Sequence, residues 1–414
     1  MSTASTSTKP QSAIVIGAGV VGTATAYSLA RRGMQVTIID ARDKAAHGTS
    51  YANGGQLSYL YTGSLANHRI RSELPELALG MNPAFRIRIS PDPDFIAWLL
   101  SFLRNCTRAR YQRNSRASLE IALESQAAML SFLQKHALDF DYQVKGKIQL
   151  LYTKKAINAI EENFSLKGLT DADQSLMDLP ALEKLEPAIK RAGEKPMAGL
   201  FTPSEAVGDA RKFAMGMLDL LTTEYDVTTH MGHRVSDVDL NASKPTVTLE
   251  TGLKLETDLV VLCTGPDKAL MRKLGLKLPI FSMKGYSITA PRGAAAPDIS
   301  ITDSKRRLVF TPLGDKIRIG GMADLGWTNW DVDPKRLEVL MSNAQHSFPE
   351  AADYSQAHDQ WAGLRPMTPD SVPRLGRPHP SLIYNLGHGM LGWTMAMGCG
   401  ERVARLIDPN PESF

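Results

Sequence analysis

Residues 13–40 read AIVIGAGVVGTATAYSLARRGMQVTIID, and this stretch decides the fold. The short apolar run Ala13–Ile16 predicts a buried strand, and the turn Gly17–Gly22 leads from it into an Ala-rich helical pattern. A second apolar run, Val36–Ile39, ends at Asp40. A strand, a glycine turn, a helix and a second strand with a terminal acid are typical of a βαβ unit that binds a dinucleotide.

The three glycines of this turn have separate physical roles. Gly17 permits the tight turn, Gly19 lets the backbone approach a pyrophosphate, and Gly22 permits close packing of the helix. Asp40 is placed to accept a hydrogen bond from a ribose hydroxyl. A glycine turn with a purely structural role is the alternative, and it is disfavoured because the strand, the helix and the distal acid all agree. The turn by itself does not separate NAD from FAD.

The composition indicates a globular protein that binds a small molecule. The chain has 414 residues, 43% of them hydrophobic, so we expect two or three domains with sizeable cores. Lys and Arg number 47 against 43 Asp and Glu, and the net charge of +4 is too slight to indicate a nucleic-acid partner. The cysteines form no C-x-x-C pair, so we expect no metal site and a reducing, cytoplasmic compartment. They are Cys106, Cys263 and Cys399.

Neither a secretory signal nor a membrane-spanning segment is predicted. Residues 1–12 are rich in Ser and Thr and lack an apolar stretch, so we expect a flexible tail. The strongly apolar segment Phe95–Leu103 has roughly half the ~20 residues that a spanning helix needs. Because arginines follow it up to residue 116, residues 95–116 could lie on an anionic membrane surface. A core helix with solvated arginines is the alternative.

After the first βαβ unit, the pattern changes between helical blocks and short strands. Residues 65–138 are mainly helical in character and are interpreted as an insertion. A helix is predicted over Ala210–Thr223, a buried parallel strand over Leu259–Leu262, and another helix over Pro334–Ser347. Alternating segments between Pro279 and Met322 predict an antiparallel sheet.

The segment Gly48–Gln56, GTSYANGGQ, has small residues and hydroxyls that would let the chain run along a pyrophosphate to a flavin ring. With this segment, the sequence resembles the family of D-amino acid oxidase, glycine oxidase and sarcosine oxidase, and within it the bacterial D-amino acid dehydrogenases. The resemblance extends over nearly the whole chain after the tail. Seven motifs in the expected order carry it: GAGVVG, TSYANGGQLS, WLLSFLRNCTRARY, PIFSMKGYSIT, IRIGGMAD, GLRPMTPDSVPRLG and NLGHGMLGWTMAMGCG.

This resemblance implies an α/β fold with a discontinuous FAD-binding domain of the glutathione-reductase-like Rossmann type. Its segments would be residues 13–64, 204–275 and 366–408. A discontinuous α+β substrate-binding domain, with an antiparallel sheet that covers the flavin, would comprise residues 65–203 and 276–365.

The resemblance also implies that FAD is bound without a covalent link, since no cysteine lies near the substrate motifs. Arg42 would lie near the adenine, which the backbone of Val235 would contact; a core strand residue is the alternative for Val235. Thr49 and Ser50 would lie along the pyrophosphate, with an ordinary helix cap as their alternative. The implied cofactor-binding residues are Gly17, Gly19, Val20, Val21, Gly22, Asp40, Arg42, Thr49, Ser50, Asn53, Gly54, Gly55, Gln56, Val235, Thr264, Gly265, Gly389, Met390, Leu391, Gly392, Trp393 and Thr394.

The glycine-rich segment Gly387–Thr394 is predicted to follow a strand and to open a helix, so its N–H groups can face an anion. In the family, this helix points at the pyrimidine edge of the flavin, where the reduced ring carries negative charge. His388 could be read as a catalytic base, but a His between glycines more often packs or donates a hydrogen bond.

Arg365 is predicted to lie at the end of a strand, and its planar guanidinium can hold a carboxylate by two parallel hydrogen bonds. The resemblance implies that it binds the carboxylate of the substrate; a structural salt bridge is the alternative. Tyr286, in the segment Lys284–Tyr286 that we expect to face the same site, could add its hydroxyl or could be a packed sheet aromatic. We expect Arg318 and Arg374 to be structural.

The implied activity is oxidative deamination of D-amino acids to 2-oxo acids and ammonia, by hydride transfer from the α carbon to N5 of FAD. Electrons would pass to a quinone or another acceptor. One alternative is an oxidase that uses oxygen on D-amino acids or on amines such as glycine, sarcosine, proline and pipecolate. Another is a non-catalytic dinucleotide-binding protein, disfavoured because Arg365 and Tyr286 add substrate chemistry. The preference for D over L rests on the family likeness alone.

Overall fold

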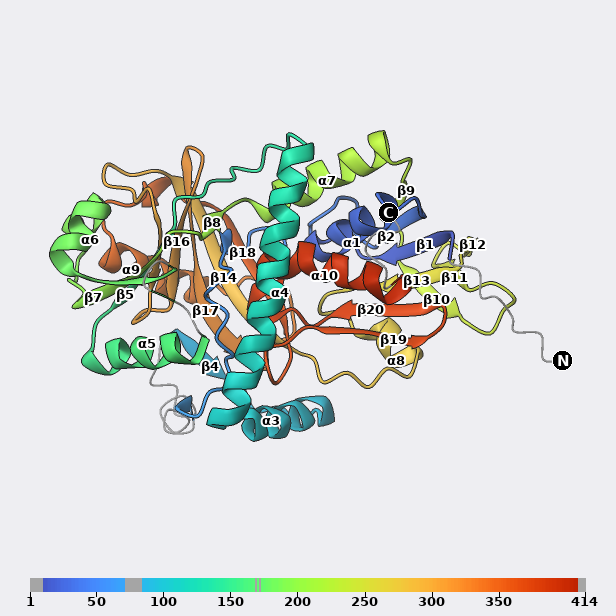
Figure 1. Ribbon diagram of the computed structural model, residues 1–414, viewed down its shortest axis with the longest axis horizontal. Helices are drawn as coiled ribbons and strands as arrows, with labels where there is room; N and C mark the ends of the chain where they lie inside the picture. Colours follow the sequence, from blue (N-terminus) through green and yellow to red (C-terminus); the bar gives the residue numbers. More distant parts are fainter. Residues whose placement is uncertain (1–9, 71–83, 168–169, 171–172, 409–414) are drawn as a thin grey trace.

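Two large sheets make up the frame of the computed structural model, which describes residues 10–70, 84–167, 170 and 173–408 (Figure 1). Nine of the twelve residues of the expected tail therefore lie outside the described residues. The six-stranded sheet contains β1 (Ser12–Ile16), β2 (Gln35–Asp40), β9 (Thr228–Met231), β13 (Leu259–Leu262), β19 (Arg374–His379) and β20 (Leu382–Leu386). Their order is β19-β20-β13-β1-β2-β9.

The glycine-turn unit lies at the centre of the six-stranded sheet. β1 pairs in parallel with both β2 and β13, and all four residues of β13 are buried, as the continuous apolar run predicts. Alternate residues of β1 point to opposite faces of the sheet: Ala13 and Val15 to one hydrophobic cluster, Ile14 and Ile16 to another. The first cluster includes side chains of α1 (Val20–Ala30), α7 (Ala210–Glu224) and α10 (Gly392–Ile407).

The opposite face of this sheet is covered by a small antiparallel meander. It consists of β10 (Val235–Asp239), β11 (Thr246–Leu249) and β12 (Lys254–Glu256), followed later by the short helix α8 (Ala269–Lys273). A two-stranded ladder, β3 (Gln56–Leu57) with β8 (Ala206–Val207), lies apart from it.

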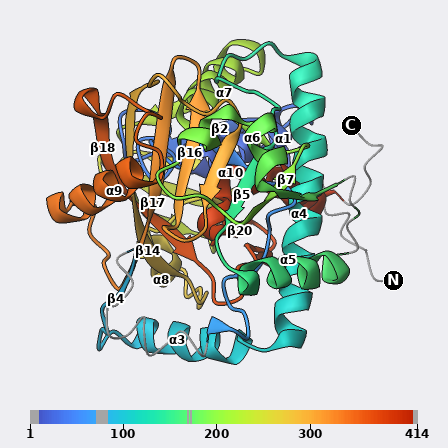
Figure 2. The same cartoon turned by 90° about the vertical axis from the view of Figure 1, so that its left-hand side faces the viewer.

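The nine-stranded sheet contains the antiparallel segments that the alternation predicts, with additional strands from the first half of the chain. Figure 2 shows its strands with α9 (Pro334–Ser347) beside them. The main path runs β18 (His358–Met367), β14 (Phe281–Pro291), β17 (Lys316–Leu325), β16 (Leu308–Leu313), β15 (Ser300–Asp303), β5 (Lys147–Leu151), β7 (Ala198–Thr202) and β6 (Ser175–Asp178). β4 (Phe85–Ile87) pairs with β17 beside this path.

Two helices account for the helical character of residues 65–138. α3 (Pro93–Asn105) is capped by Asp92, and α4 (Arg108–Lys135) is capped by Thr107. α4 runs across the long axis of the molecule and packs against α10 (Figure 1). Residues 71–83 of this block lie outside the described residues. Two further helices, α5 (Lys154–Lys167) and α6 (Leu179–Leu185), follow it.

Several short strands were not predicted from the sequence. β9 reads TTHM and lies at the edge of its sheet, so its apolar pattern is weak. β6 is likewise an edge strand, and β4 and β12 are only three residues long. Within the described part of the chain, no helix is both long and apolar enough to cross a membrane.

Candidate active site

A cavity of about 1550 Å³ runs from the glycine turn of the six-stranded sheet to the nine-stranded sheet. This volume exceeds the ~300–1,000 Å³ of ordinary small-molecule pockets and is large enough for a dinucleotide together with a substrate. Its wall contains all the predicted site residues except Gly22. The cavity therefore brings together segments that are more than 300 residues apart in sequence, from Gly17 to Thr394.

The three glycines of the turn differ in what surrounds them. Gly17 has φ +113°, its N–H donates to the carbonyl of Ile39 at 2.7 Å, and a Cβ there would be 2.4 Å from the carbonyl oxygen of Cys263. A Cβ on Gly22 would be 1.7 Å from the carbonyl oxygen of Gly17, which explains its absence from the cavity wall. The nearest protein atom to a Cβ on Gly19 would be Ser50 Oγ, at 3.4 Å, so the remaining space in front of Gly19 belongs to the cavity.

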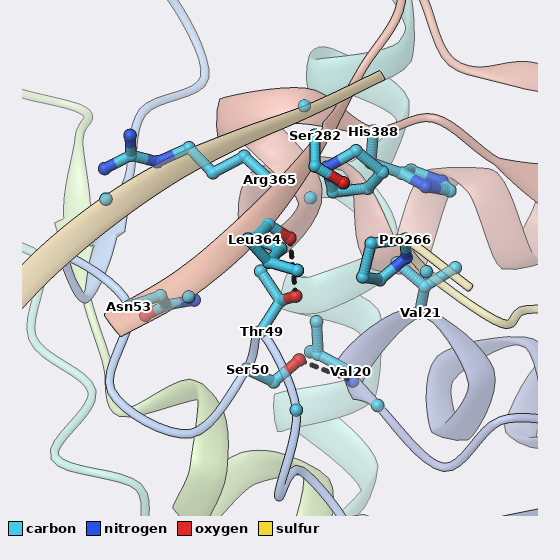
Figure 3. A pocket seen from close by; sticks show the side chains of 18 of the residues that line it. Val20, Val21, Thr49, Ser50, Asn53, Pro266, Ser282, Leu364, Arg365 and His388 are labelled. Atoms are coloured by element: carbon cyan, nitrogen blue, oxygen red, sulfur yellow. Dashed lines mark hydrogen bonds between the residues drawn. The ribbon is translucent and has the colours of Figure 1, made fainter. Parts of the chain in front are cut away.

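The N-terminus of α1 faces the cavity, and a loop residue already binds one of its N–H groups. Val20 N–H donates to Ser50 Oγ at 3.1 Å, so Ser50 acts as a cap from outside the helix (Figure 3). Thr49 Oγ1 donates to the carbonyl of Leu364 at 2.7 Å and thereby connects this loop to β18. Ser50 therefore caps the N-terminus of α1, and it also lines the cavity together with Val21.

Asp40 supports the turn through both of its carboxylate oxygens. Oδ2 accepts from Ala18 N–H at 2.6 Å and Oδ1 from Arg42 N–H at 2.8 Å. Each oxygen keeps a further lone pair, so the carboxylate can also accept from a ribose hydroxyl in the cavity that it lines. Val235, the first residue of β10, is 8% exposed and belongs to both the cavity wall and a hydrophobic cluster.

The chain after the cap residue Ser50 runs from α1 toward the nine-stranded sheet. Asn53 Oδ1 accepts from Gly55 N–H at 3.0 Å, and Gly55 has φ +67°. Gln56 Nε2 donates to Ser300 Oγ at 2.7 Å. These two hydrogen bonds fix the segment Asn53–Gln56 internally and to β15. The backbone of this segment is therefore held along the cavity wall.

Two further predicted segments lie where strands of the six-stranded sheet end. After β13, Thr264 Oγ1 donates to the carbonyl of Asp267 at 2.9 Å, and Gly265 has φ +59°. After β20, the segment Gly389–Thr394 turns into α10 and lines the cavity. Trp393 Nε1 donates to the carbonyl of Gly208, so this side chain already has its partner within the protein.

His388 is a neutral imidazole inside the cavity wall. It is 6% exposed, and burial lowers its pKa to about 4. Its Nε2 is buried without a hydrogen-bond partner among the described residues. A group with this pKa is a weak base at neutral pH.

The side chain of Arg365 extends toward the upper left of Figure 3, away from Val20. A Cβ on Gly285 would be 2.1 Å from Arg365 Nη2, so the guanidinium lies directly over this glycine of β14. Nη1 donates to the carbonyl of Met322 at 3.0 Å. Burial lowers the pKa of Arg365 to about 10, while the charge of Asp324 raises it, so the group stays cationic at neutral pH. No carboxylate within the described ranges forms an ion pair with it.

The expectation that Lys284 faces the site is wrong. Lys284 is 2% exposed, is not part of the cavity wall, and donates from Nζ to Asn329 Oδ1 at 2.9 Å and to the carbonyl of Asp331. Tyr286 does line the cavity, but its hydroxyl donates to Asp324 Oδ2 at 3.4 Å and its ring belongs to a hydrophobic cluster. Successive residues of β14 point to opposite faces of the sheet. Lys284 therefore points away from the face on which Gly285 contacts the guanidinium of Arg365.

The charges around Tyr286 form a network. Asp324, which is fully buried, binds Arg86 at 2.5 Å and Arg336 at 2.6 Å. Burial and the charge of Asp324 raise the pKa of Tyr286 above its ordinary value, so its hydroxyl keeps its proton. Arg318 and Arg374 form ion pairs with Asp209 at 3.1 Å and Asp370 at 2.9 Å, in agreement with the structural roles expected of them.

Several wall residues were missed from the sequence. Lys147, at the start of β5, is 4% exposed, donates to Ser58 Oγ at 3.0 Å and has its Nζ 3.9 Å from the ring centroid of Tyr61. The buried carboxylate of Glu205 accepts from the N–H groups of Tyr59 and Leu60 and so fixes the loop before Tyr61. Lys147 breaks the apolar pattern of a strand, which was an available signal.

The chain matches the family model described as FAD dependent oxidoreductase over residues 12–406. The chain belongs to this family. Among curated proteins, this FAD-dependent oxidoreductase is similar to D-amino acid dehydrogenase 2 of Pseudomonas aeruginosa, with 36% identity over 98% of this chain and 96% of that protein. It is also similar to the D-amino acid dehydrogenase of Neisseria meningitidis, with 35% identity over 95% of each chain.

Solved structures show the same fold. Glycine oxidase from Geobacillus kaustophilus superposes with a TM-score of 0.75 at 20% identity, covering 98% of this chain and 97% of the other. L-proline dehydrogenase from P. horikoshii gives 0.71 at 18% identity, covering 97% and 94%. Family membership makes the protein FAD-dependent, and its cavity fits that cofactor: the turn is open at Gly19, an acid lies at Asp40, and the volume accommodates a dinucleotide.

Proposed function

We propose that the protein oxidises D-amino acids to 2-oxo acids and ammonia, with Arg365 as the residue that binds the substrate carboxylate. One observation carries this proposal: a partly buried guanidinium, cationic at neutral pH and without an ion-pair partner among the described residues, lines the cavity. A charge that is partly removed from water is costly unless a counter-charge meets it. A carboxylate-bearing substrate supplies that counter-charge. The choice of D-amino acids is supported by the names of the curated relatives.

The chemistry requires alignment more than a strong base. Bound FAD supplies the acceptor for the hydride at N5. When the substrate amine is neutral, its lone pair forms the C=N bond as the Cα hydrogen leaves with its electron pair. Water then adds to the imino acid and ammonia departs. His388, with a pKa near 4, is neutral and suited to hydrogen bonding rather than to proton abstraction at neutral pH.

Tyr286 is proposed as a second group at the substrate end of the cavity. Its hydroxyl donates its proton to Asp324. The hydroxyl oxygen can still accept a hydrogen bond from a substrate amine. A Tyr286→Phe variant that retains wild-type KM and kcat would contradict the role.

Anaerobic reduction of the flavin tests the proposed function. Bleaching of the flavin absorbance by D-amino acids, and not by the L enantiomers, is the expected result. Reduced enzyme is then mixed with air or with a quinone: fast reoxidation by quinone and slow reoxidation by air indicates a dehydrogenase, and hydrogen peroxide formation indicates an oxidase. A flavin that no amino acid in a panel including glycine, sarcosine and proline bleaches would overturn the proposal.

We further propose peripheral contact with an anionic membrane through residues 95–116. α3 buries Phe95, Trp98 and Phe102 but leaves Ile96 48% and Leu100 51% exposed. The first three belong to a hydrophobic cluster, so the core interpretation describes one face of the helix. Exposed arginines follow, which favours an anionic lipid surface. They are Arg104, Arg108, Arg110, Arg113 and Arg116.

Sedimentation with lipid vesicles tests this contact. Wild-type protein should co-sediment with vesicles that contain an anionic phospholipid and not with purely zwitterionic vesicles. The double variant Ile96→Ser, Leu100→Ser should lose this binding while its flavin content stays unchanged. Equal binding of both proteins would contradict the proposed surface.

A further inference from the structure

The loop of residues 326–333, which joins β17 to α9, reaches the cavity from the nine-stranded sheet. Its residues Thr328 and Trp330 line the cavity, and Trp330 is 37% exposed. Neither the motifs nor the spacing of the sequence marked this loop.

Trp330 contacts the segment that follows β2. The guanidinium carbon of Arg42 lies 4.7 Å from the centroid of the Trp330 ring, a cation–π geometry. A Cβ on Gly48 would be 4.0 Å from Cη2 of Trp330 and 3.8 Å from Nε of Arg42. The ring of Trp330 and the guanidinium of Arg42 therefore lie together beside the segment that follows Asp40, the acid proposed to bind the ribose.

A buried ammonium group holds this loop in place. Lys284 Nζ donates to Asn329 Oδ1 and to the carbonyl of Asp331, the two neighbours of Trp330 in the chain. Asn329 Nδ2 also donates to Asp331 Oδ2 at 2.6 Å. At the start of the loop, Gly326 has φ +98° and a Cβ there would be 2.2 Å from the carbonyl oxygen of Arg88. The loop is thus fixed at its start and on both sides of the tryptophan.

We propose that Trp330 is a cofactor-binding residue contributed by the nine-stranded sheet, which closes the cavity with Arg42 over the adenosine half of FAD. Lys284 is its positioning residue: it is not itself part of the cavity wall and acts through the loop. In this arrangement, the buried Lys284 of β14 supports the cofactor-binding loop and does not contact the substrate. It also means that the two sheets hold the cofactor jointly, so that FAD leaves only when this contact opens.

The rate of FAD release measures this role without any turnover. Holoprotein is diluted into buffer, and the rise of flavin fluorescence on release gives the dissociation rate constant. Trp330→Ala should release FAD about five-fold faster, the factor expected from the loss of one aromatic contact with a cation. Trp330→Phe, which keeps an aromatic ring, should stay within about two-fold of wild type. Where a variant purifies without flavin, the affinity of the apoprotein for added FAD is measured instead and should fall by the same order.

Val332→Ala is the matched control, because Val332 is 36% exposed, lies in the same loop and is not part of the cavity wall. It should release FAD at the wild-type rate. Lys284→Met, which removes the ammonium and keeps the length of the side chain, should accelerate release as Trp330→Ala does. Wild-type release from Trp330→Ala, or equal acceleration by Val332→Ala, would overturn the proposal. Since no substrate is involved, neither result depends on which amine the enzyme oxidises.

Discussion

Arg365 and Gly285 share one space: the guanidinium of Arg365 lies where a side chain of Gly285 would have to be, with Nη2 only 2.1 Å from the position of its Cβ. On the antiparallel pair β14 and β18, Arg365 is opposite Met283, and Gly285 is opposite Gly363. Arg365 therefore crosses β14 at its glycine and reaches Met322 on β17. The missing side chain is what allows the charge to lie flat against the sheet and face the cavity.

Gly285→Ala should displace this guanidinium without removing it. The new methyl group would force Arg365 away from Met322, and the substrate carboxylate would lose part of its charge-assisted hydrogen bonding. We expect KM for a D-amino acid to rise about ten-fold, with the flavin spectrum unchanged. Steady-state kinetics on the flavin-loaded protein measure this. An unchanged KM would contradict the position that we assign to the substrate carboxylate.

Arg365→Ala should have a larger effect of the same kind. Removing the cation altogether costs one strong bidentate interaction, so KM should rise about 100-fold and turnover should fall while FAD remains bound. Arg365→Lys keeps the charge but loses the fork geometry, and should give an intermediate KM. If Arg365→Ala instead loses flavin and retains its kinetics per bound flavin, the residue supports the cofactor and not the substrate.

The local part of this site was predictable from sequence because it is set by short segments. The turn Gly17–Gly22, the acid Asp40 and the strand at Leu259–Leu262 each follow from periodicity and glycine spacing, and the structure assembles them as expected. The helix Pro334–Ser347 was predicted with the bounds observed, since Asp333 and Pro334 mark its start. The strand β9 could not be found, because an edge strand needs no apolar alternation.

The face toward which a strand residue points was harder to predict. Lys284 and Tyr286 were both expected to face the site, yet only Tyr286 lines the cavity, and a register irregularity separates the two residues in the pairing of β14 with β17. A one-residue shift exchanges the faces of a strand, and nothing in a single sequence reveals it. The contact of Trp330 with Arg42 was invisible for a different reason: the two residues are 288 positions apart and meet only through the packing of the two sheets.

Gly19 and Gly22 should respond differently to the same substitution. In Gly19→Ala the added methyl meets no protein atom closer than 3.4 Å, so the protein should fold, but the methyl would occupy the approach to the pyrophosphate. We expect about ten-fold weaker FAD binding, measured by titrating apoprotein with FAD. In Gly22→Ala the methyl would be 1.7 Å from Gly17 O, so thermal unfolding should show destabilisation of about 3 kcal/mol or more. Full flavin occupancy and wild-type affinity in Gly19→Ala would contradict the assignment of the turn.

The buried imidazole of His388 should make stability depend on pH. Its pKa is about 4 in the folded protein against an ordinary 6.5, so the unfolded chain binds more protons between these values. The contribution of His388 is therefore fully present above pH 6.5 and is lost as the pH falls toward 4, by about 2 kcal/mol at pH 5. Comparing the free energy of unfolding in urea at pH 7.5 and pH 5 should show a smaller loss for His388→Gln than for wild type. His358→Gln, at a histidine whose side chain is 42% exposed, is the matched control. If His388→Gln loses as much stability as wild type on acidification, burial does not hold the imidazole neutral. The argument against a role of His388 in proton transfer would then fail.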